Sequence, residues 1–185
     1  MIQMPLHRWR GCTLTFVLMG GALLFVFFTS APALSQSCVA GILPSNPTSV
    51  YVVANGTVTD QRSGLMWDQC TWGHTGGDCA IGASSFHTWR EALAVPAGAN
   101  ASVYKGYTDW RLPNLKELRS IVEECRIAPS INDAVFPGIT ASNYWSNSPH
   151  SYDPSTAWDV DFYNGISSVD TRDFRGSVRL VRAGR

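Results

Sequence analysis

One ten-residue stretch constrains the fold more than any other, because it specifies a sharp corner. Residues 109–118 read Asp-Trp-Arg-Leu-Pro-Asn-Leu-Lys-Glu-Leu. Pro113 disfavours helical backbone at the residue before it, so the first part is expected to be extended. Asn114 can then cap a helix, with Glu117 as the reciprocal partner of a capping box. Apolar residues follow at helical spacing, which predicts that one stripe of this helix faces a core: Leu115, Leu118, Ile121, Val122 and Cys125.

The first 35 residues are predicted to be a signal peptide and not part of the fold. Basic residues stand before position 11, an almost wholly apolar run covers 11–30, and small residues follow. Cleavage is expected after Ala33 or Ser35, which predicts a secreted, periplasmic or cell-surface protein. The apolar run approaches the roughly 20 residues that span a bilayer, so a retained membrane anchor is the alternative. The remainder divides into an N-terminal lead, 36–50, and a domain, 51–185.

The charge balance argues against a nucleic-acid partner. The chain has 14 basic and 14 acidic residues. Arg8 and Arg10 leave with the signal peptide and no acid does, so the mature chain has 12 basic residues against 14 acidic ones. A mildly acidic chain without a basic tail offers no general attraction for polyanions. Contact with a membrane is expected only through an uncleaved N-terminal segment.

Four cysteines follow the signal peptide, and an even number in an exported chain predicts disulfides. Three pairings are possible. We expect Cys70–Cys79, which closes a short Gly-rich loop, and Cys38–Cys125, which ties the lead to the end of the central helix. Loop-closure entropy gives these bonds about 2.7 and about 4.6 kcal/mol. The alternative is a zinc site, which the absence of Cys-x-x-Cys spacing disfavours.

The order of the predicted elements indicates an α+β domain. Asn55-Gly56 between two β-rich segments is a hairpin signal. Thr88 with Glu91 forms a second capping box, and Pro96 and Gly98 are expected to end that short helix. Strands, two short central helices and further strands favour mainly antiparallel sheets. The predicted strands are 51–53, 57–59, 65–67, 144–148, 156–162, 166–169 and 178–182.

Aromatic residues divide into candidate ligand platforms and candidate core residues. An aromatic face with a polar rim suits a carbohydrate ring. The aromatic residues in or beside predicted loops are Trp72, Tyr144, Trp145, Tyr152 and Tyr163. Those on periodic faces, which favours a place in the core, are Trp67, Trp89, Trp110 and Trp158.

A group of basic residues on and around the central helix is a second candidate ligand site, for anionic glycans. It comprises Arg111, Lys116 and Arg119, with Arg126 just beyond the helix. Lys116 and Arg119 are three residues apart and can share a face. The alternative is a solvated helix surface, with these cations paired to the nearby acids Glu117, Glu123 and Glu124.

Asp159 and Asp161 are the candidates for a calcium site. Two residues apart on a predicted strand, they can point the same way. Calcium requires about six to eight oxygen ligands, which the local sequence does not supply. The alternative is a solvated strand face with Arg172 or Arg179 as cross-strand partner. No cofactor is therefore expected, with calcium as the one possibility.

The sequence also argues against an enzyme. His74, His87 and His150 have no carboxylate at motif spacing, and neither Gly-x-Ser-x-Gly nor His-Glu-x-x-His occurs. We therefore predict that the chain is not catalytic.

Four pieces occur in a fixed order: 57–60 with 64–67, 109–113 with 117–118, 144–146, and 178–182. Together they resemble the Lcl C-terminal domain family, a bacterial domain of unknown function named after part of a collagen-like adhesin. The resemblance implies an exported, disulfide-tied, C-type-lectin-like fold. It also implies an adhesin-like module that binds an extracellular polysaccharide. The chain lacks the Gly-X-Y repeat that precedes the domain in the adhesin, so trimerisation is not implied.

Two other functions stay open beside that one. The same scaffold can serve as a structural or protein-interaction domain without a sugar site. The lectin-like fold also houses formylglycine-generating enzymes, which use cysteines in copper and oxygen chemistry. Here disulfides explain the cysteines better.

Overall fold

The computed structural model describes residues 38–139 and 142–184, which belong to one compact unit covering 34–185. The predicted signal peptide and the first two residues of the lead lie outside the described residues, so cleavage and anchoring remain predictions. Among the helices that are described, none has the length and apolar character needed to span a bilayer.

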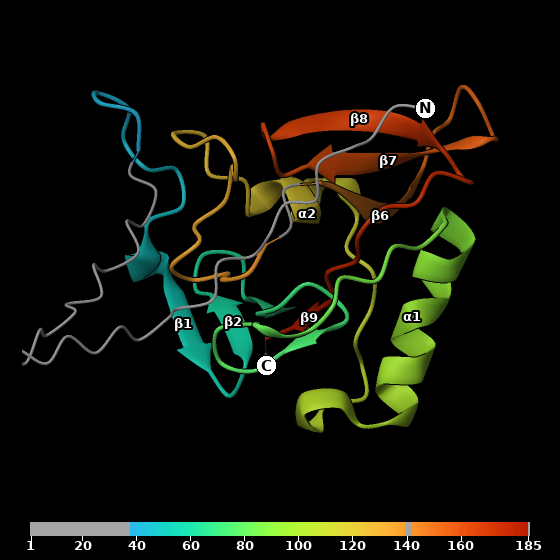
Figure 1. Cartoon of the computed structure of the whole chain (residues 1–185), viewed down its shortest axis with the longest axis horizontal. Coiled ribbons are helices and arrows are strands. Elements are labelled where there is room, and N and C mark those ends of the chain that lie inside the picture. Colours follow the sequence, from blue (N-terminus) through green and yellow to red (C-terminus); the bar gives the residue numbers. More distant parts are fainter. Residues whose placement is uncertain (1–37, 140–141, 185) are drawn as a thin grey trace, which may run out of the picture. The chain divides into compact units, whose positions relative to one another are not determined.

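The first sheet begins with the predicted hairpin. Strands β1 (Tyr51–Ala54) and β2 (Thr57–Asp60) pair antiparallel, with Ala54 opposite Thr57. Asn55 and Gly56 between them have positive φ angles of 51° and 74°, as a type I′ turn requires. Strand β3 (Leu65–Asp68) follows and pairs with β2. A short 3₁₀ turn, η1 (Thr48–Val50), leads into this meander (Figure 1).

The predicted closing strand completes this sheet, but only its end is a strand. Strand β9 (Val181–Ala183) pairs with β3, giving the order β1-β2-β3-β9. Before it, residues 178–180 bind the end of β3 and the chain that follows: the Asp68 amide donates to the Leu180 carbonyl, and the Trp72 amide to the Val178 carbonyl, both at 2.9 Å. Arg179 is fully buried here. Its Nη1 donates to the carbonyls of Asp68 and Gln69, at 2.8 and 2.6 Å.

Helix α1 (Trp89–Ala101) starts at the predicted capping box but runs past its predicted end. Pro96 lies inside the helix and cannot donate a backbone hydrogen bond there. Distant contacts hold the last turn in place, because the Asn100 side chain donates to the Trp110 carbonyl and accepts from the Trp110 amide. A partner ten residues away is invisible to a local pattern, so the predicted stop at Pro96 and Gly98 was wrong. A 3₁₀ turn, η2 (Tyr104–Gly106), follows.

The corner at 109–118 forms as predicted, with a shorter helix. Asn114 and Glu117 make the reciprocal capping box, and helix α2 covers only Leu115–Ser120. The chain then turns, and the Glu123 carboxylate accepts the amides of Ser45 and Asn46 from the lead. The predicted helical stripe is thus buried without being helical to its end: Ile121, Val122 and Cys125 lie in the interior after the helix has stopped.

The second sheet consists of β6 (Asn143–Pro149), β7 (Thr156–Asp161) and β8 (Ile166–Thr171), all antiparallel in that order. Figure 1 shows β8 at its outer margin. Val160 of β7 and Phe162 just beyond it point into the core, as their alternation predicted. The architecture is therefore α+β with antiparallel sheets, as the element order indicated.

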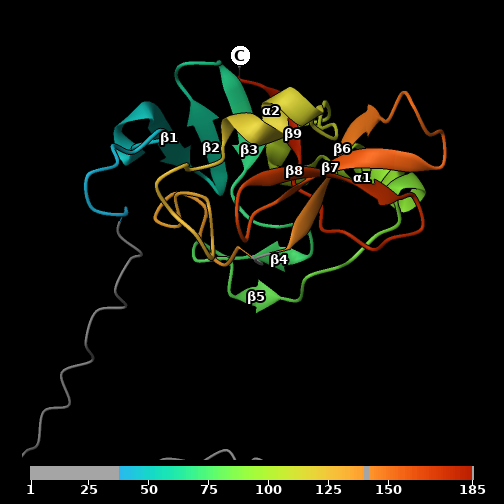
Figure 2. The same ribbon diagram turned by 90° about the horizontal axis from the view of Figure 1, so that it is seen from above.

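Both predicted disulfides are present. Cys38–Cys125 has a Cα–Cα distance of 4.8 Å and Cys70–Cys79 one of 5.4 Å. All four sulfurs are thus bonded to one another, which removes the zinc alternative for the oxidised chain. The loop closed by Cys70–Cys79 contains β4 (His74–Thr75), which pairs with β5 (Ile81–Gly82) just after the loop; Figure 2 shows this two-stranded sheet at one margin.

The core consists of two clusters. One lies around Trp67, Leu118, Tyr144 and Phe162. The other includes Trp110, Trp145, Ala92, Ala99 and Leu180, and joins α1 to both sheets. Of the tryptophans predicted to be core residues, Trp67 and Trp110 are buried, whereas Trp89 and Trp158 are only partly so.

Candidate functional site

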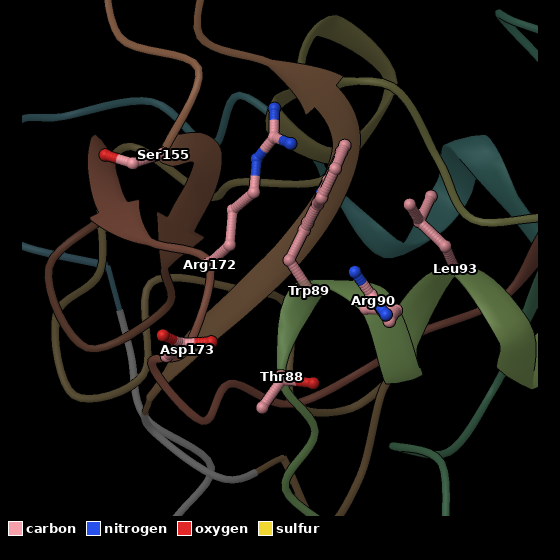
Figure 3. Close-up of a pocket in the computed structure, with 7 residues that line it drawn as sticks. All are labelled: Thr88, Trp89, Arg90, Leu93, Ser155, Arg172 and Asp173. Atoms are coloured by element: carbon pink, nitrogen blue, oxygen red, sulfur yellow. The ribbon is translucent and has the colours of Figure 1, made fainter.

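A pocket of about 700 Å³ opens where the start of α1 meets the end of β8. Its lining comes from three separate parts of the chain: the first turn of α1, the loop before β7, and the residues just after β8. Figure 3 shows the Trp89 ring beside Arg172, with Ser155 and Asp173 on one side and Arg90 and Leu93 on the other. The lining residues are Thr88, Trp89, Arg90, Leu93, Ser155, Arg172 and Asp173.

The capping box fixes Trp89 at the wall of this pocket. Thr88 accepts the Glu91 amide through its hydroxyl, and its own amide donates to the Glu91 carboxylate. These bonds hold the pKa of the Glu91 carboxyl below its usual value, with Arg175 adding to the effect. The Trp89 amide donates to the Arg172 carbonyl at 2.9 Å, and its indole N–H donates to the Ser146 carbonyl at 2.8 Å. The ring is therefore held at its polar edge while part of it stays exposed.

Arg172 lies over that ring. Its guanidinium carbon is 4.3 Å from the ring centre, within the range of a cation–π contact. Its Nε donates to the Thr156 carbonyl at 3.3 Å, and its amide donates to the Ser155 carbonyl. Two strands and the helix thus position one planar cation against one aromatic ring.

The rim of the pocket offers hydrogen-bonding groups of both kinds. Arg90 and Arg172 supply donors, Asp173 supplies a carboxylate, and Thr88 and Ser155 supply hydroxyls. A partly exposed aromatic ring with such a rim can hold a ring-shaped ligand that carries hydroxyl groups. The seven lining side chains include neither histidine nor cysteine.

Two of the predicted ligand-binding aromatics are not accessible. Tyr144 and Trp145 are both fully buried. The Tyr144 hydroxyl pairs with that of Thr71 at 2.6 Å, and the Trp145 indole donates to the His87 carbonyl at 2.8 Å. The expectation that a ligand stacks on them is wrong for this structure, because the strand that carries them runs through the core and not along a loop.

The other loop aromatics lie apart from the pocket lining. Trp72 is half-buried and packs edge-on against Tyr104, with ring centres 5.3 Å apart. Tyr152 is 93% exposed, and its ring centre is 6.0 Å from that of His150. Tyr163 is also exposed, in the β7–β8 turn. Of these, only Tyr152 lies in the loop that also supplies Ser155.

The predicted basic cluster is largely neutralised. Arg111 makes two hydrogen bonds to the Glu117 carboxylate, at 2.7 and 2.6 Å. This pairing raises the pKa of Arg111. Arg119 donates to the Gly165 carbonyl and pairs with Glu124. Lys116 is exposed beside them. The geometry favours the solvated, acid-paired surface over an anion site.

The two calcium candidates, Asp159 and Asp161, lie in different environments. Asp161 accepts the Tyr163 amide and shapes the β7–β8 turn. Asp159 is fully buried, with Asn143 and Ser168 as donors. The expected solvated face and its arginine partner are therefore wrong for Asp159. Arg172 lies over Trp89, and Arg179 binds main-chain carbonyls.

The sequence did not indicate the pocket residues as a group. Trp89 was assigned to the core because it begins an apolar helical pattern, and Arg172 was named only as a possible ion-pair partner. The Thr88 capping box was the one local signal in the region. It fixes where the helix starts, but nothing in the pattern of 88–93 points to a partner more than 80 positions later.

Comparison of the sequence with known protein families gives one match. A family model described as the Lcl C-terminal domain matches residues 56–182. That range begins in the turn of the first hairpin and ends in β9, so it contains the pocket, the whole second sheet and the first sheet except β1 and the last residue of β9. No curated protein matches the chain.

Proposed function

The chain belongs to the Lcl C-terminal domain family, and from that premise we propose that it is an exported, non-catalytic module that binds an extracellular polysaccharide. The two disulfides indicate an oxidising environment, such as the periplasm or the extracellular space. We infer a C-type-lectin-like relationship for the fold from its two short helices, antiparallel sheets and covalent ties.

The pocket at Trp89 and Arg172 carries the proposal. Its ring is held rigidly by the indole bond to Ser146, so little entropy is lost when a sugar packs on it. The surrounding hydroxyls, carboxylate and guanidinium groups match the mixed donors and acceptors of a sugar ring. The ligand needs no metal in this proposal, since the pocket lining contains one carboxylate.

A glycan array tests this function directly. The mature chain, with its disulfides intact, is applied with and without a calcium chelator. We expect binding to at least one glycan in both conditions. Binding to none would contradict the polysaccharide proposal, and binding that the chelator abolishes would contradict its independence from calcium.

Variants at the rim then locate the site. Arg90→Ala and Asp173→Ala change exposed side chains of the pocket, and each should weaken binding about tenfold, as loss of one charged hydrogen bond does. Tyr152→Ala and Lys116→Ala are matched controls, exposed and outside the lining. Loss of binding in the controls alone would move the site to the loop or helix that the sequence suggested.

One observation favours a protein-interaction role as the second candidate. Large apolar side chains are exposed in the lead and on the edge strand β1: Val39, Ile42, Leu43, Val52 and Val53. Exposed apolar surface of this kind can mark contact with another protein. Affinity capture from the natural host, after a negative array, would separate this role from glycan binding.

The enzyme alternative has no support from the cysteines. In the described part of the chain every cysteine sulfur is bonded to another, so the copper and oxygen chemistry of a formylglycine-generating enzyme would lack its thiols.

A further inference from the structure

Four polar side chains meet on one face of the second sheet. Asp159 of β7 lies opposite Ser168 of β8, and Asp170 is its diagonal neighbour. The Asn143 amide nitrogen of β6 donates to both carboxylates, at 2.9 Å to Asp159 and 3.1 Å to Asp170. Ser168 donates its hydroxyl to Asp159 at 2.7 Å. One nitrogen thus bridges two acids on adjacent strands.

One oxygen of this cluster lacks a partner. Asp159 is fully buried, and its Oδ2 accepts no hydrogen bond from any described residue, while both donors go to Oδ1. Buried polar atoms are nearly always paired, because an unpaired one has lost water without replacement. Because a single amide nitrogen contacts both carboxyl groups, they lie in one small polar site, where a proton on one of them would let it donate to the other.

The electrostatics agree with that geometry. The pKa of Asp159 is raised to about 6. Burial is the main cause, and the neighbouring Asp170 also raises the pKa, whereas the hydrogen bonds from Ser168 and Asn143 lower it. Two ionised carboxylates that share a buried site repel each other, so one of them keeps its proton to higher pH.

We propose that Asp159 and Asp170 share one proton, and that losing it as the pH rises loosens β8 from the sheet. Among the described strands β8 pairs only with β7 and is therefore an edge strand, so charge repulsion between Asp159 and Asp170 acts on the pairing that holds β8 in the sheet. Arg172 follows β8 directly, which places the pocket next to the affected strand. The proposal does not depend on the glycan function, because its test needs no ligand.

Other charged groups lie on the neighbouring segments, and their effect on stability must be distinguished from that of the pair. By their place in the chain these groups are Asp161 on β7, Arg172, Asp173 and Arg175 after β8, His87 before α1, and Arg90 and Glu91 in α1. His87 matters most, since burial lowers its pKa. Because the folded state disfavours the charged form of His87, the free energy of unfolding that this residue contributes decreases as the pH falls. Asp159 has the opposite sign: its stabilisation is present at low pH and is lost as the pH rises through about 6.

Comparison of variant with wild type isolates the pair, because the His87 contribution is common to both. The mature chain and its Asp159→Asn variant are unfolded thermally at pH 5 and pH 7.5. The Asn side chain keeps the shape and can donate to Asp170. We expect the Tm of the variant, relative to wild type, to rise by about 4 °C between the two pH values, as a tenfold change in the folding constant gives in a domain of this size.

Asp161→Asn is the matched control, since it removes an acid from the same strand and face. Its Tm relative to wild type should not change between pH 5 and pH 7.5. A constant difference for Asp159→Asn, or an equal rise in the control, would overturn the proposal. A calcium effect would also overturn it. If calcium raises the Tm of the wild type but not that of Asp159→Asn, the pair holds a cation and not a proton.

Carbon-13 titration of the aspartate carboxyls in the unmodified chain keeps the test valid if the variant fails to fold. One carboxyl should titrate near pH 6. If every aspartate titrates below about pH 4.5, the pair shares no proton.

Discussion

Three arginines of the described chain lie over aromatic rings, and two of them differ most: Arg179 lies in the interior and Arg172 at the surface. The Arg179 guanidinium is 4.9 Å from the ring centre of Phe136 and fully buried. That of Arg172 is 4.3 Å from the ring centre of Trp89, at the wall of the pocket. The chemical pair is the same, so the difference between the sites lies in their remaining hydrogen bonds.

Those bonds assign the two arginines different roles. Arg179 uses its Nη1 on two main-chain carbonyls and lies near the Thr71 hydroxyl. Arg172 uses only its Nε within the described chain. An arginine whose donors satisfy buried carbonyls holds the fold together, whereas one with donors left at a pocket can bind a ligand.

Arg179→Ala should have the largest effect on stability. It leaves the carbonyls of Asp68 and Gln69 without donors in the interior and opens a cavity beside Phe136. We expect the free energy of unfolding to fall by about 3 kcal/mol, or the chain not to fold. Denaturant unfolding with the disulfides intact measures this.

Arg175→Ala is the control, because Arg175 is an exposed arginine of the same segment. It should cost less than about 0.5 kcal/mol. A loss below about 1 kcal/mol for Arg179→Ala would show that the interior arginine is not the support that its contacts indicate.

Arg182→Ala should have an intermediate effect. Arg182 lies 3.9 Å from the Tyr107 ring centre and donates to Asp109 at 2.6 Å. Because the Asp109 side chain is half exposed, the ion pair adds little beyond the stacking. We expect a loss of about 1–2 kcal/mol.

Asp109→Asn separates the charge from the packing in that pair. The hydrogen bond from Arg182 lowers the pKa of Asp109, so its stabilisation is present above the ordinary carboxyl pKa and is lost as the pH falls through the lowered value. Acid unfolding of the wild type should include this loss, and that of Asp109→Asn should not. Identical acid curves would mean that Arg182 acts by stacking alone.

Arg172→Ala should have the smallest effect on stability and a large one on binding. A partly exposed cation–π contact contributes about 0.5 kcal/mol, whereas loss of the planar cation should weaken glycan binding at least about tenfold. Arg172→Lys tests the planar shape and should restore stability more than binding. If Arg172→Ala destabilises the chain as much as Arg179→Ala, the distinction between the two arginines fails.

The features that the sequence predicted well are those that neighbouring residues determine. Asn55-Gly56 requires a tight hairpin, and Asn114 with Glu117 requires a helix start, whatever lies around them. The pairing of Cys38 with Cys125 followed from which loops the bonds would close. Each of these depends on chemistry within a few residues or on a count of cysteines.

The features that it missed depend on contacts between distant segments. Pro96 stays helical because Asn100 binds Trp110, and Asp159 is buried because Asn143 and Ser168 arrive from two other strands. The pocket is of the same kind, since Trp89 and Arg172 meet only after both sheets have formed. Periodicity shows which face of a strand is apolar, but not which polar side chains a neighbouring strand brings to the other face.

The Cys38–Cys125 bond has a mechanical consequence. It links two positions 87 residues apart, so tension applied at residue 38 passes directly to residue 125 and bypasses everything between them. The first hairpin, α1 and α2 lie within that covalent loop and carry no load. Only the segment from 126 to 184, with the second sheet and β9, can lengthen under a pull between the two ends. Because β9 pairs with β3 in the first sheet, such a pull would detach β9 and extend the second sheet, whereas β1, β2 and β3 would stay inside the closed loop.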